Sequence, residues 1–274
     1  MHINHIGISG GKDSTALLLW AVHESGYPLD SIVASFCDTG NEAPETYDYI
    51  AMLSDRVHPI RTIKPPLDFW ELAAKKSRFP SVKARFCTQA LKIFPTQDYI
   101  KSLLLEGHTV LLHSGVRADE SNERAKLAER EWDEYYATEV YRPLLRWTLA
   151  DVWACLARYG IPRNPLYDLG ARRVGCFPCI MSNKAEMRMI GKQFPERIEF
   201  LAAKEREINS SFFRADTTPE AFRRWSVTNK SGETWQVPSV RDVVDWANTS
   251  RGGRQYEMDL DEGALCESNL GVCE

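Results

Sequence analysis

The sequence predicts an α/β fold in which a Rossmann-like, mostly parallel sheet is flanked by helices and followed by a helical, cysteine-bearing C-terminal part. Two observations predict this fold. Short apolar segments alternate with helical segments through the first half, and a pair of glycines joins the first strand to the first helix. The pattern changes after about Tyr141. We therefore predict an α/β domain over residues 1–174 and a C-terminal region over residues 175–274 that packs on it.

The apolar pattern sets the expected elements in order. Strands are expected at residues 3–9, 31–36, 57–63 and 109–113. Helices are expected at residues 14–23, 44–54, 88–105, 148–159, 195–209 and 239–248. Thr148, followed three residues later by Asp151, has the spacing of a helix cap. Because ligands gather at the carboxyl ends of parallel strands, we expect the chemistry in the loops that follow Ser9, Phe36 and His113.

Composition and charge exclude several classes of protein. With 43% hydrophobic and 26% charged residues among 274, the chain is neither disordered nor fibrous. Its net charge of −4 does not suit a surface coated with cations to hold nucleic acid. No apolar run approaches the roughly 18 residues that span a bilayer, and no basic segment followed by an apolar one opens the sequence. We therefore expect a cytoplasmic protein without a membrane contact.

The first candidate site is the loop Ser9-Gly10-Gly11-Lys12-Asp13-Ser14. Unpaired N–H groups at a helix start favour an anion, and glycines let the backbone approach it. Ser9 and Ser14 add hydroxyl donors, and Lys12 adds a positive charge. The spacing is neither that of a Walker A loop nor that of a dinucleotide-binding loop. We expect a phosphate or sulfate site here; the alternative is a glycine turn with a capping serine.

Two further strand-end loops carry charged residues. Asp38 and Glu42 follow the second strand, where they can hold Mg²⁺ directly or through water. Arg117 and Arg124 follow the fourth strand, where they can stabilise charge that develops on a phosphate. The alternative for Arg124 is a surface helical pair with Glu120 that contributes little energy.

These segments resemble a known superfamily. Residues 9–14 resemble the pyrophosphate-binding PP-loop, Ser-Gly-Gly-x-Asp-Ser, of the adenine nucleotide α-hydrolases, which include ATP pyrophosphatases, tRNA thiolases and sulfonucleotide reductases. Residues 38–42, 113–124 and 141–153 resemble segments of the phosphoadenosine phosphosulfate reductase-like branch, so the likeness extends over roughly residues 3 to 180. The resemblance implies a PP-loop nucleotide-binding domain that cleaves ATP between its α- and β-phosphates. In the reductase branch, the same loop holds a sulfonucleotide.

The resemblance also implies roles for individual residues. ATP with Mg²⁺ would be bound by Ser9, Gly10, Gly11, Lys12, Asp13, Ser14, Asp38, Thr39, Gly40 and Gly115. The catalytic residues would be Lys12, Asp38, Arg117 and Arg124.

The seven cysteines are not expected to form disulfides in the cytosol. Cys37 and Cys155 lie in apolar segments and are expected to be buried. Cys176 and Cys179 form a C-x-x-C that, with the distant Cys87, has the pattern of a metal site. The alternatives are a structural Zn²⁺ site and a redox dithiol.

Adenylyl-sulfate reductases, which this cysteine pattern resembles, hold a [4Fe–4S] cluster with a Cys-Cys pair and a later C-x-x-C. Phe86 stands here in place of one cysteine of that pair. The fourth ligand would then be Cys266 or Cys273, or one iron would stay open to carry sulfide.

The tail departs from the sulfonucleotide reductases, because it lacks their Glu-Cys-Gly-x-His motif around Cys266 and Cys273. The leading hypothesis is therefore an ATP pyrophosphatase of sulfur transfer, similar to the components of DNA phosphorothioation systems. Its partners would be a cysteine desulfurase, other subunits of the modification system and a DNA acceptor, which the basic residues near Cys87 and Cys176 would contact. The first alternative is a sulfonucleotide reductase that uses thioredoxin or glutaredoxin. The second is a non-catalytic nucleotide-binding or iron–sulfur subunit.

Overall fold

The structure, a computed structural model, describes residues 1–228 and 231–250. Its centre is a six-stranded sheet in the order β3-β2-β1-β4-β6-β5. The strands are β1 (His2–Ile8), β2 (Ile32–Cys37), β3 (Ile60–Ile63), β4 (Thr109–His113), β5 (Arg130–Asp133) and β6 (Thr138–Tyr141). All neighbours pair in parallel except β5 with β6. The predicted mostly parallel sheet is confirmed, and the carboxyl ends of β1, β2 and β4 lie next to one another.

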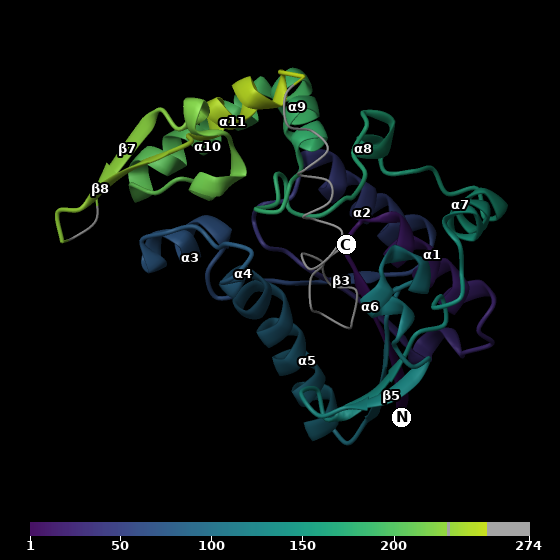
Figure 1. The fold of residues 1–274 in the computed structure, drawn as a ribbon. Helices are drawn as coiled ribbons and strands as arrows, with labels where there is room; N and C mark the ends of the chain where they lie inside the picture. The colour runs from purple at the N-terminus through teal and green to yellow at the C-terminus, as the bar shows by residue number, and fades with distance from the viewer. Residues whose placement is uncertain (229–230, 251–274) are drawn as a thin grey trace.

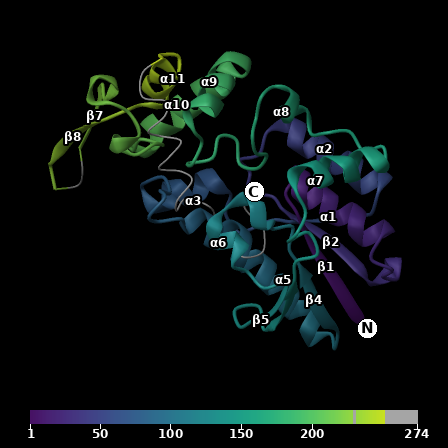
Figure 2. The ribbon, with the colours of Figure 1, turned by 45° about the vertical axis from the view of Figure 1, so that its right-hand side comes forward.

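Helices cover both faces of this sheet (Figures 1 and 2). On one face, α1 (Lys12–His23), α2 (Pro44–Arg56) and α7 (Leu149–Arg158) bury their apolar residues against β1 and β2. On the other face, α5 (Phe94–Leu105) packs Ile100 and Leu103 against β4 and β6. Burial of this apolar surface is the main stabilising contribution.

Local sequence signals account for the helix ends. Thr148 caps α7 as expected: its hydroxyl accepts a hydrogen bond from the Asp151 N–H at 3.2 Å, and the Asp151 carboxylate accepts one from the Thr148 N–H at 2.7 Å. The helix expected at residues 88–105 is instead three consecutive segments, namely α4 (Phe86–Thr88), a π-helical turn (Gln89–Ile93) and α5. Pro95 has no N–H to donate, so the hydrogen-bond pattern changes before it.

The C-terminal elements form a second layer beyond the carboxyl edge of the sheet (Figure 1). They are α8 (Pro165–Asp168), α9 (Lys184–Gln193), α10 (Pro195–Ile208), α11 (Val240–Ala247) and a hairpin of β7 (Trp225–Thr228) and β8 (Thr234–Val237). Their core also contains Phe69 and Trp70 of α3 (Phe69–Lys76). Within this core Gly191 lies so close to α11 that an added Cβ would stand 2.5 Å from Val244 Cγ1.

The fold includes two helices, α3 and α9, and four strands, β5 to β8, that were not expected from the sequence. Helix α3 begins at a capping box of Asp68 and Glu71, and α9 begins at one of Asn183 and Glu186. Strands β5 and β6 are only four residues long, and the β7–β8 hairpin adds a sheet to a region expected to be helical. Such short segments show too little periodicity to be recognised. In the described part of the chain no helix is both long and apolar enough to cross a membrane.

Two histidines are buried in the sheet. The His5 ring lies 2.8 Å from the Ser35 hydroxyl, and the His113 ring lies 3.2 Å from the Tyr27 hydroxyl. Burial lowers the pKa of each histidine from 6.5 to about 4. Both rings are therefore neutral in the folded protein at pH 7.

We predict that these histidines make folding sensitive to acid. Between pH 6.5 and pH 4 the unfolded chain binds a proton at each ring that the folded chain excludes, so the free energy of unfolding falls as the pH falls. The loss is about 3 kcal/mol for each histidine. Urea denaturation at several pH values should show this loss of unfolding free energy between pH 6.5 and pH 4. His113→Phe should reduce the loss by about half. His2→Ala, which removes an exposed ring, should not.

Candidate functional site

The predicted phosphate loop connects β1 to α1. Gly10 adopts a φ of +79°, and an added Cβ would stand 2.8 Å from Thr46 Cγ2 of α2. The Ser9 and Ser14 hydroxyls lie 3.0 Å apart. A residue far along the chain holds the other side of the loop: the Asn164 side-chain amide donates to the Gly10 carbonyl at 3.2 Å. The loop is thus fixed between α2 and α8.

Asp13 orients the two cations expected to bind phosphate. Its carboxylate lies 2.6 Å from Lys12 Nζ and 2.5 Å from Arg117 Nε, and its side chain is 1% exposed. Arg117 is nearly as buried. Burial acts to lower the pKa of Arg117, but the Asp13, Glu120 and Asp119 carboxylates together outweigh burial and raise the pKa, so the guanidinium stays charged. The structure therefore brings Lys12, Asp13 and Arg117 together and gives Asp13 a positioning role.

Arg124 is not the surface residue of the alternative interpretation. It is 7% exposed, forms an ion pair with Glu120, and its Nη2 is buried without a hydrogen-bond partner in the described part of the chain. Glu120 also accepts a hydrogen bond from the Arg117 N–H at 3.0 Å. One carboxylate therefore links both arginines, and Arg124 keeps a donor that an anionic ligand can use.

The acidic loop that follows β2 has its own hydrogen bonds. The Tyr47 hydroxyl donates to Asp38 at 2.6 Å and lies 3.3 Å from Glu42, while Thr39 donates to Glu42 at 2.7 Å. Burial raises the pKa of Glu42, and the Lys92 charge opposes this. Burial and the hydrogen bond to Asp38 raise the pKa of Tyr47, so the phenol keeps its proton. The Tyr47 hydroxyl thus links Asp38 and Glu42 at the end of β2, where the sequence predicts a magnesium site.

Lys92 also lies at the site, although it was not among the residues expected from the sequence. This lysine lies in the π-helical turn, is 9% exposed, and borders a cavity of about 20 Å³ with Ser9, Glu42 and Gly175. A lysine between the apolar residues of a helix, as in Leu91-Lys92-Ile93, is the signal that could have identified it. Its charge lies next to both the phosphate loop and the acidic loop.

The loop that carries Cys176 and Cys179, the cysteine loop, packs on the acidic loop, which carries Asp38 and Glu42. Phe177 donates its N–H to the Asn41 carbonyl at 2.6 Å, and the Asn41 amide donates to the Pro178 carbonyl at 3.2 Å. Arg197 of α10 donates to the Phe177 carbonyl at 2.7 Å and also to Asn41. These contacts place the Cys176 sulfur 3.9 Å from a Glu42 carboxylate oxygen. Asn41 and Arg197 were not expected at the site, because their partners are distant in the sequence.

The described cysteines do not by themselves assemble a metal site. Cys87, Cys176 and Cys179 are half-buried. Within residues 1–228 and 231–250, no group of three or more His, Cys, Asp or Glu side chains is placed to hold a metal ion. Cys266 and Cys273 lie outside the described residues. The iron–sulfur and zinc sites stay predictions, and no chemical step below depends on either. Cys155 is buried as expected, whereas Cys37 is only half-buried.

We predict that Gly10→Ala disrupts the phosphate loop. The added methyl group meets Thr46 of α2, so the loop must move away from α2, and nucleotide affinity should fall at least tenfold. Gly26→Ala is the matched control, because Gly26 has a φ of +76° and nothing within 4 Å of an added Cβ. Calorimetric titration with ATP or a sulfonucleotide measures both variants, and Thr46→Ser should restore part of the loss. Equal effects of the two alanines would contradict the packing argument.

Comparison with known proteins places this geometry in a family. Residues 4–182 match the phosphoadenosine phosphosulfate reductase domain. The chain is 35% identical to an uncharacterised 37.8 kDa protein of Escherichia phage 186, over 99% of this chain and 97% of that protein. It is 31% identical to adenosine 5'-phosphosulfate reductase 1 of Bacillus subtilis over 53% of this chain and 60% of that enzyme. The chain therefore spans nearly all of the phage protein but less than two thirds of the Bacillus subtilis enzyme.

A solved structure agrees at the level of fold. The phosphoadenylyl-sulfate reductase of Candida auris, in a phosphate complex, superposes with a TM-score of 0.50 and 22% identity, over 65% of this chain and 83% of that one. The match to the domain extends over more than half of the chain and includes the phosphate loop, the acidic loop and the cysteine pair. This chain belongs to the phosphoadenosine phosphosulfate reductase domain family.

Proposed function

We propose that this protein is an ATP pyrophosphatase of sulfur transfer, which adenylylates an oxygen of a nucleic-acid acceptor and so prepares it for sulfur. One observation carries the proposal: a half-buried lysine, a buried arginine and a pair of carboxylates lie at adjoining strand ends. Lys12 and Arg117 are at the ends of β1 and β4, and Asp38 is at the end of β2. This combination suits a triphosphate bound with Mg²⁺.

The residues divide the chemistry between them. Lys12, Arg117 and Arg124 would bind the phosphates and stabilise charge as the acceptor oxygen attacks the α-phosphorus. The bond between the α-phosphorus and its bridging oxygen breaks, and pyrophosphate leaves. Asp38 and Glu42 would hold Mg²⁺, which neutralises charge on the leaving pyrophosphate. A thiol would release hydrosulfide from the persulfide that a cysteine desulfurase supplies, and a disulfide would form. The hydrosulfide would then displace AMP, which departs with the acceptor oxygen.

The part of the chain beyond the family match supports an acceptor larger than a nucleotide. The match ends at residue 182, and α9, α10, α11 and the β7–β8 hairpin follow it. Arg197 of α10 and the Phe177 carbonyl join this added layer to the acidic loop. An added layer fixed to the site is where an acceptor such as DNA would be recognised, together with other subunits of a modification system.

A second candidate is sulfonucleotide reduction to sulfite with thioredoxin or glutaredoxin. The similarity to adenosine 5'-phosphosulfate reductases favours it, including 41% identity over 102 residues with the enzyme of Allochromatium vinosum. The buried arginines and Lys92 would then hold the phosphate and sulfate groups. This reaction does not release pyrophosphate and so needs no Mg²⁺ to neutralise its charge. It therefore gives Asp38 and Glu42 no metal ion to bind.

We predict that Asp38→Asn separates the two candidates. If ATP is the substrate, pyrophosphate release should fall by about 10²-fold or more, because the substitution removes a charge that binds Mg²⁺. If a sulfonucleotide is the substrate, sulfite formation should change far less. The protein would be purified anaerobically and incubated with ATP-Mg²⁺, a desulfurase and an oligonucleotide, or with phosphoadenosine phosphosulfate and thioredoxin.

Lys12→Ala is the companion variant. It should abolish either activity, because both use the phosphate loop, and Lys101→Ala on the exposed face of α5 should abolish neither. Absence of pyrophosphate, AMP and sulfite from the wild-type protein would contradict both enzymatic candidates and favour a nucleotide-binding subunit.

A further inference from the structure

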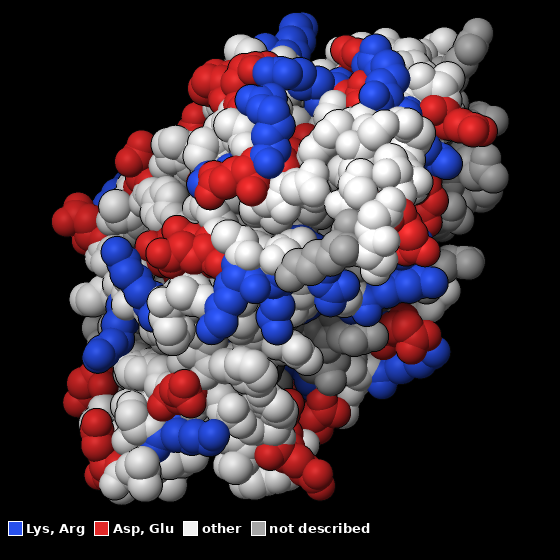
Figure 3. Space-filling model, turned by 90° about the vertical axis from the view of Figure 1, so that its left-hand side faces the viewer, with Lys and Arg blue, Asp and Glu red and all other residues white. Residues whose placement is uncertain are grey.

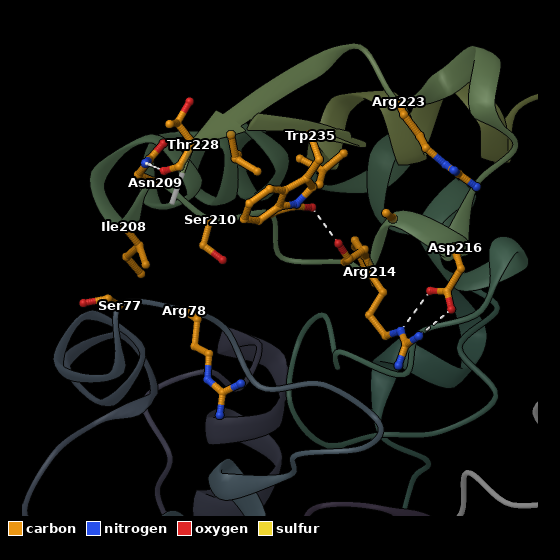
Figure 4. Close-up of a pocket in the computed structure, with 15 residues that line it drawn as sticks. Ser77, Arg78, Ile208, Asn209, Ser210, Arg214, Asp216, Arg223, Thr228 and Trp235 are labelled. Atoms are coloured by element: carbon orange, nitrogen blue, oxygen red, sulfur yellow. Dashed lines mark hydrogen bonds and ion pairs between the residues drawn. The ribbon is translucent and has the colours of Figure 1, made fainter. Parts of the chain in front are cut away.

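A large cavity lies away from the phosphate loop, between the end of α3 and the β7–β8 hairpin (Figure 4). Its volume is about 800 Å³, within the range that encloses a small molecule. Its polar and aromatic lining includes Ser77, Arg78, Asn209, Arg214, Arg223 and Trp235. None of the lining residues comes from the candidate site above, and most lie beyond residue 182, where the family match ends.

An aromatic side chain forms one wall of this cavity. Trp235 of β8 is 47% exposed, although large apolar side chains are normally covered. Figure 4 shows its indole on the hairpin side of the cavity, with Arg78 across from it at the end of α3. An exposed indole that faces a cavity provides a platform on which a planar ring can stack.

Three arginines also line the cavity, and contacts within the chain orient them. Arg214 forms two hydrogen bonds with Asp216, at 2.8 and 2.5 Å. Arg223 donates twice to the Thr218 carbonyl, at 3.3 and 3.1 Å. Arg78 lies 5.7 Å from the centre of the Phe86 ring. Among the described residues of the lining Asp216 is the one acidic side chain, so this part of the cavity has a positive balance although the chain is negative overall.

The surface around the cavity is also positively charged in part. Lys75 and Lys76 occupy the last turn of α3 and are exposed. Figure 3 shows Lys and Arg side chains in a band across the middle of this face of the molecule. A basic surface beside an aromatic platform is the combination that binds single-stranded nucleic acid, in which phosphates meet cations and bases stack.

We infer that the cavity between α3 and the β7–β8 hairpin binds one or two unpaired nucleotides of a single strand, with a base on Trp235 and phosphates on Arg78 and Arg214. The cavity encloses a volume suited to separate bases, whereas a stacked duplex exposes only its edges and backbone. The inference rests on the proposed function in one respect, since it gives the nucleic-acid acceptor its binding place. The binding itself needs no turnover.

Fluorescence anisotropy with a labelled single-stranded DNA oligonucleotide tests this site in the full chain. Trp235→Ala should weaken binding about tenfold, and Trp235→Phe should retain most of it. Trp132→Ala is the matched control, because Trp132 on β5 is 65% exposed and outside the cavity. Arg78→Ala should weaken binding and reduce its dependence on salt, whereas Lys101→Ala should change both less.

The outcomes are distinct. Equal binding by wild type and Trp235→Ala overturns the inference, as does equal loss in Trp235→Ala and Trp132→Ala. Tighter binding of duplex DNA, or displacement of the oligonucleotide by a polyglutamate peptide at equal charge, also overturns it. Trp235-dependent binding without pyrophosphate release supports this site and contradicts the proposed function. Pyrophosphate release together with binding that does not depend on Trp235 supports the proposed function and contradicts this site.

Discussion

The buried carboxylate of Asp13 is the constraint on which the candidate site depends. It joins Lys12 at the start of α1 to Arg117 in the loop after β4, and so connects two strand ends that are more than 100 positions apart in the sequence. Without this carboxylate, the positive charges of Lys12 and Arg117 would repel each other where water screens charge only weakly. Loss of one partner from such a buried group costs about 3–5 kcal/mol. The loop that follows β1 and the loop that follows β4 are therefore held together by one interaction.

A second set of contacts joins the sheet to the C-terminal layer. Asn41 and Arg197 hold the cysteine loop against the acidic loop, which places the Cys176 thiol beside Glu42. The core of the C-terminal layer also incorporates α3, so the two predicted regions of the chain pack on each other through shared residues. A substrate bound at the strand ends would thus be in contact with groups from both regions.

This arrangement suggests how one nucleotide-binding fold can serve an additional substrate. The family region supplies the phosphate loop, the buried arginines and the acidic loop, all at the carboxyl edge of the sheet. The following layer supplies a separate cavity whose arginines are oriented by their own carboxylate and carbonyl partners. Nucleotide chemistry and acceptor recognition would then be carried by different parts of the chain, and each can be altered without the other.

The sequence by itself determined the features that depend on neighbouring residues. Alternating apolar segments predicted the parallel sheet, the glycines predicted the turn after β1, and Thr148 with Asp151 predicted the start of α7. These signals are local, because side-chain periodicity and helix capping act over a few residues. Only the tertiary structure decided that Asp13 orients Arg117, that Lys92 reaches the acidic loop, and that Trp235 faces a cavity formed with α3. Those contacts join residues far apart in the chain, and their geometry follows from how the layers pack.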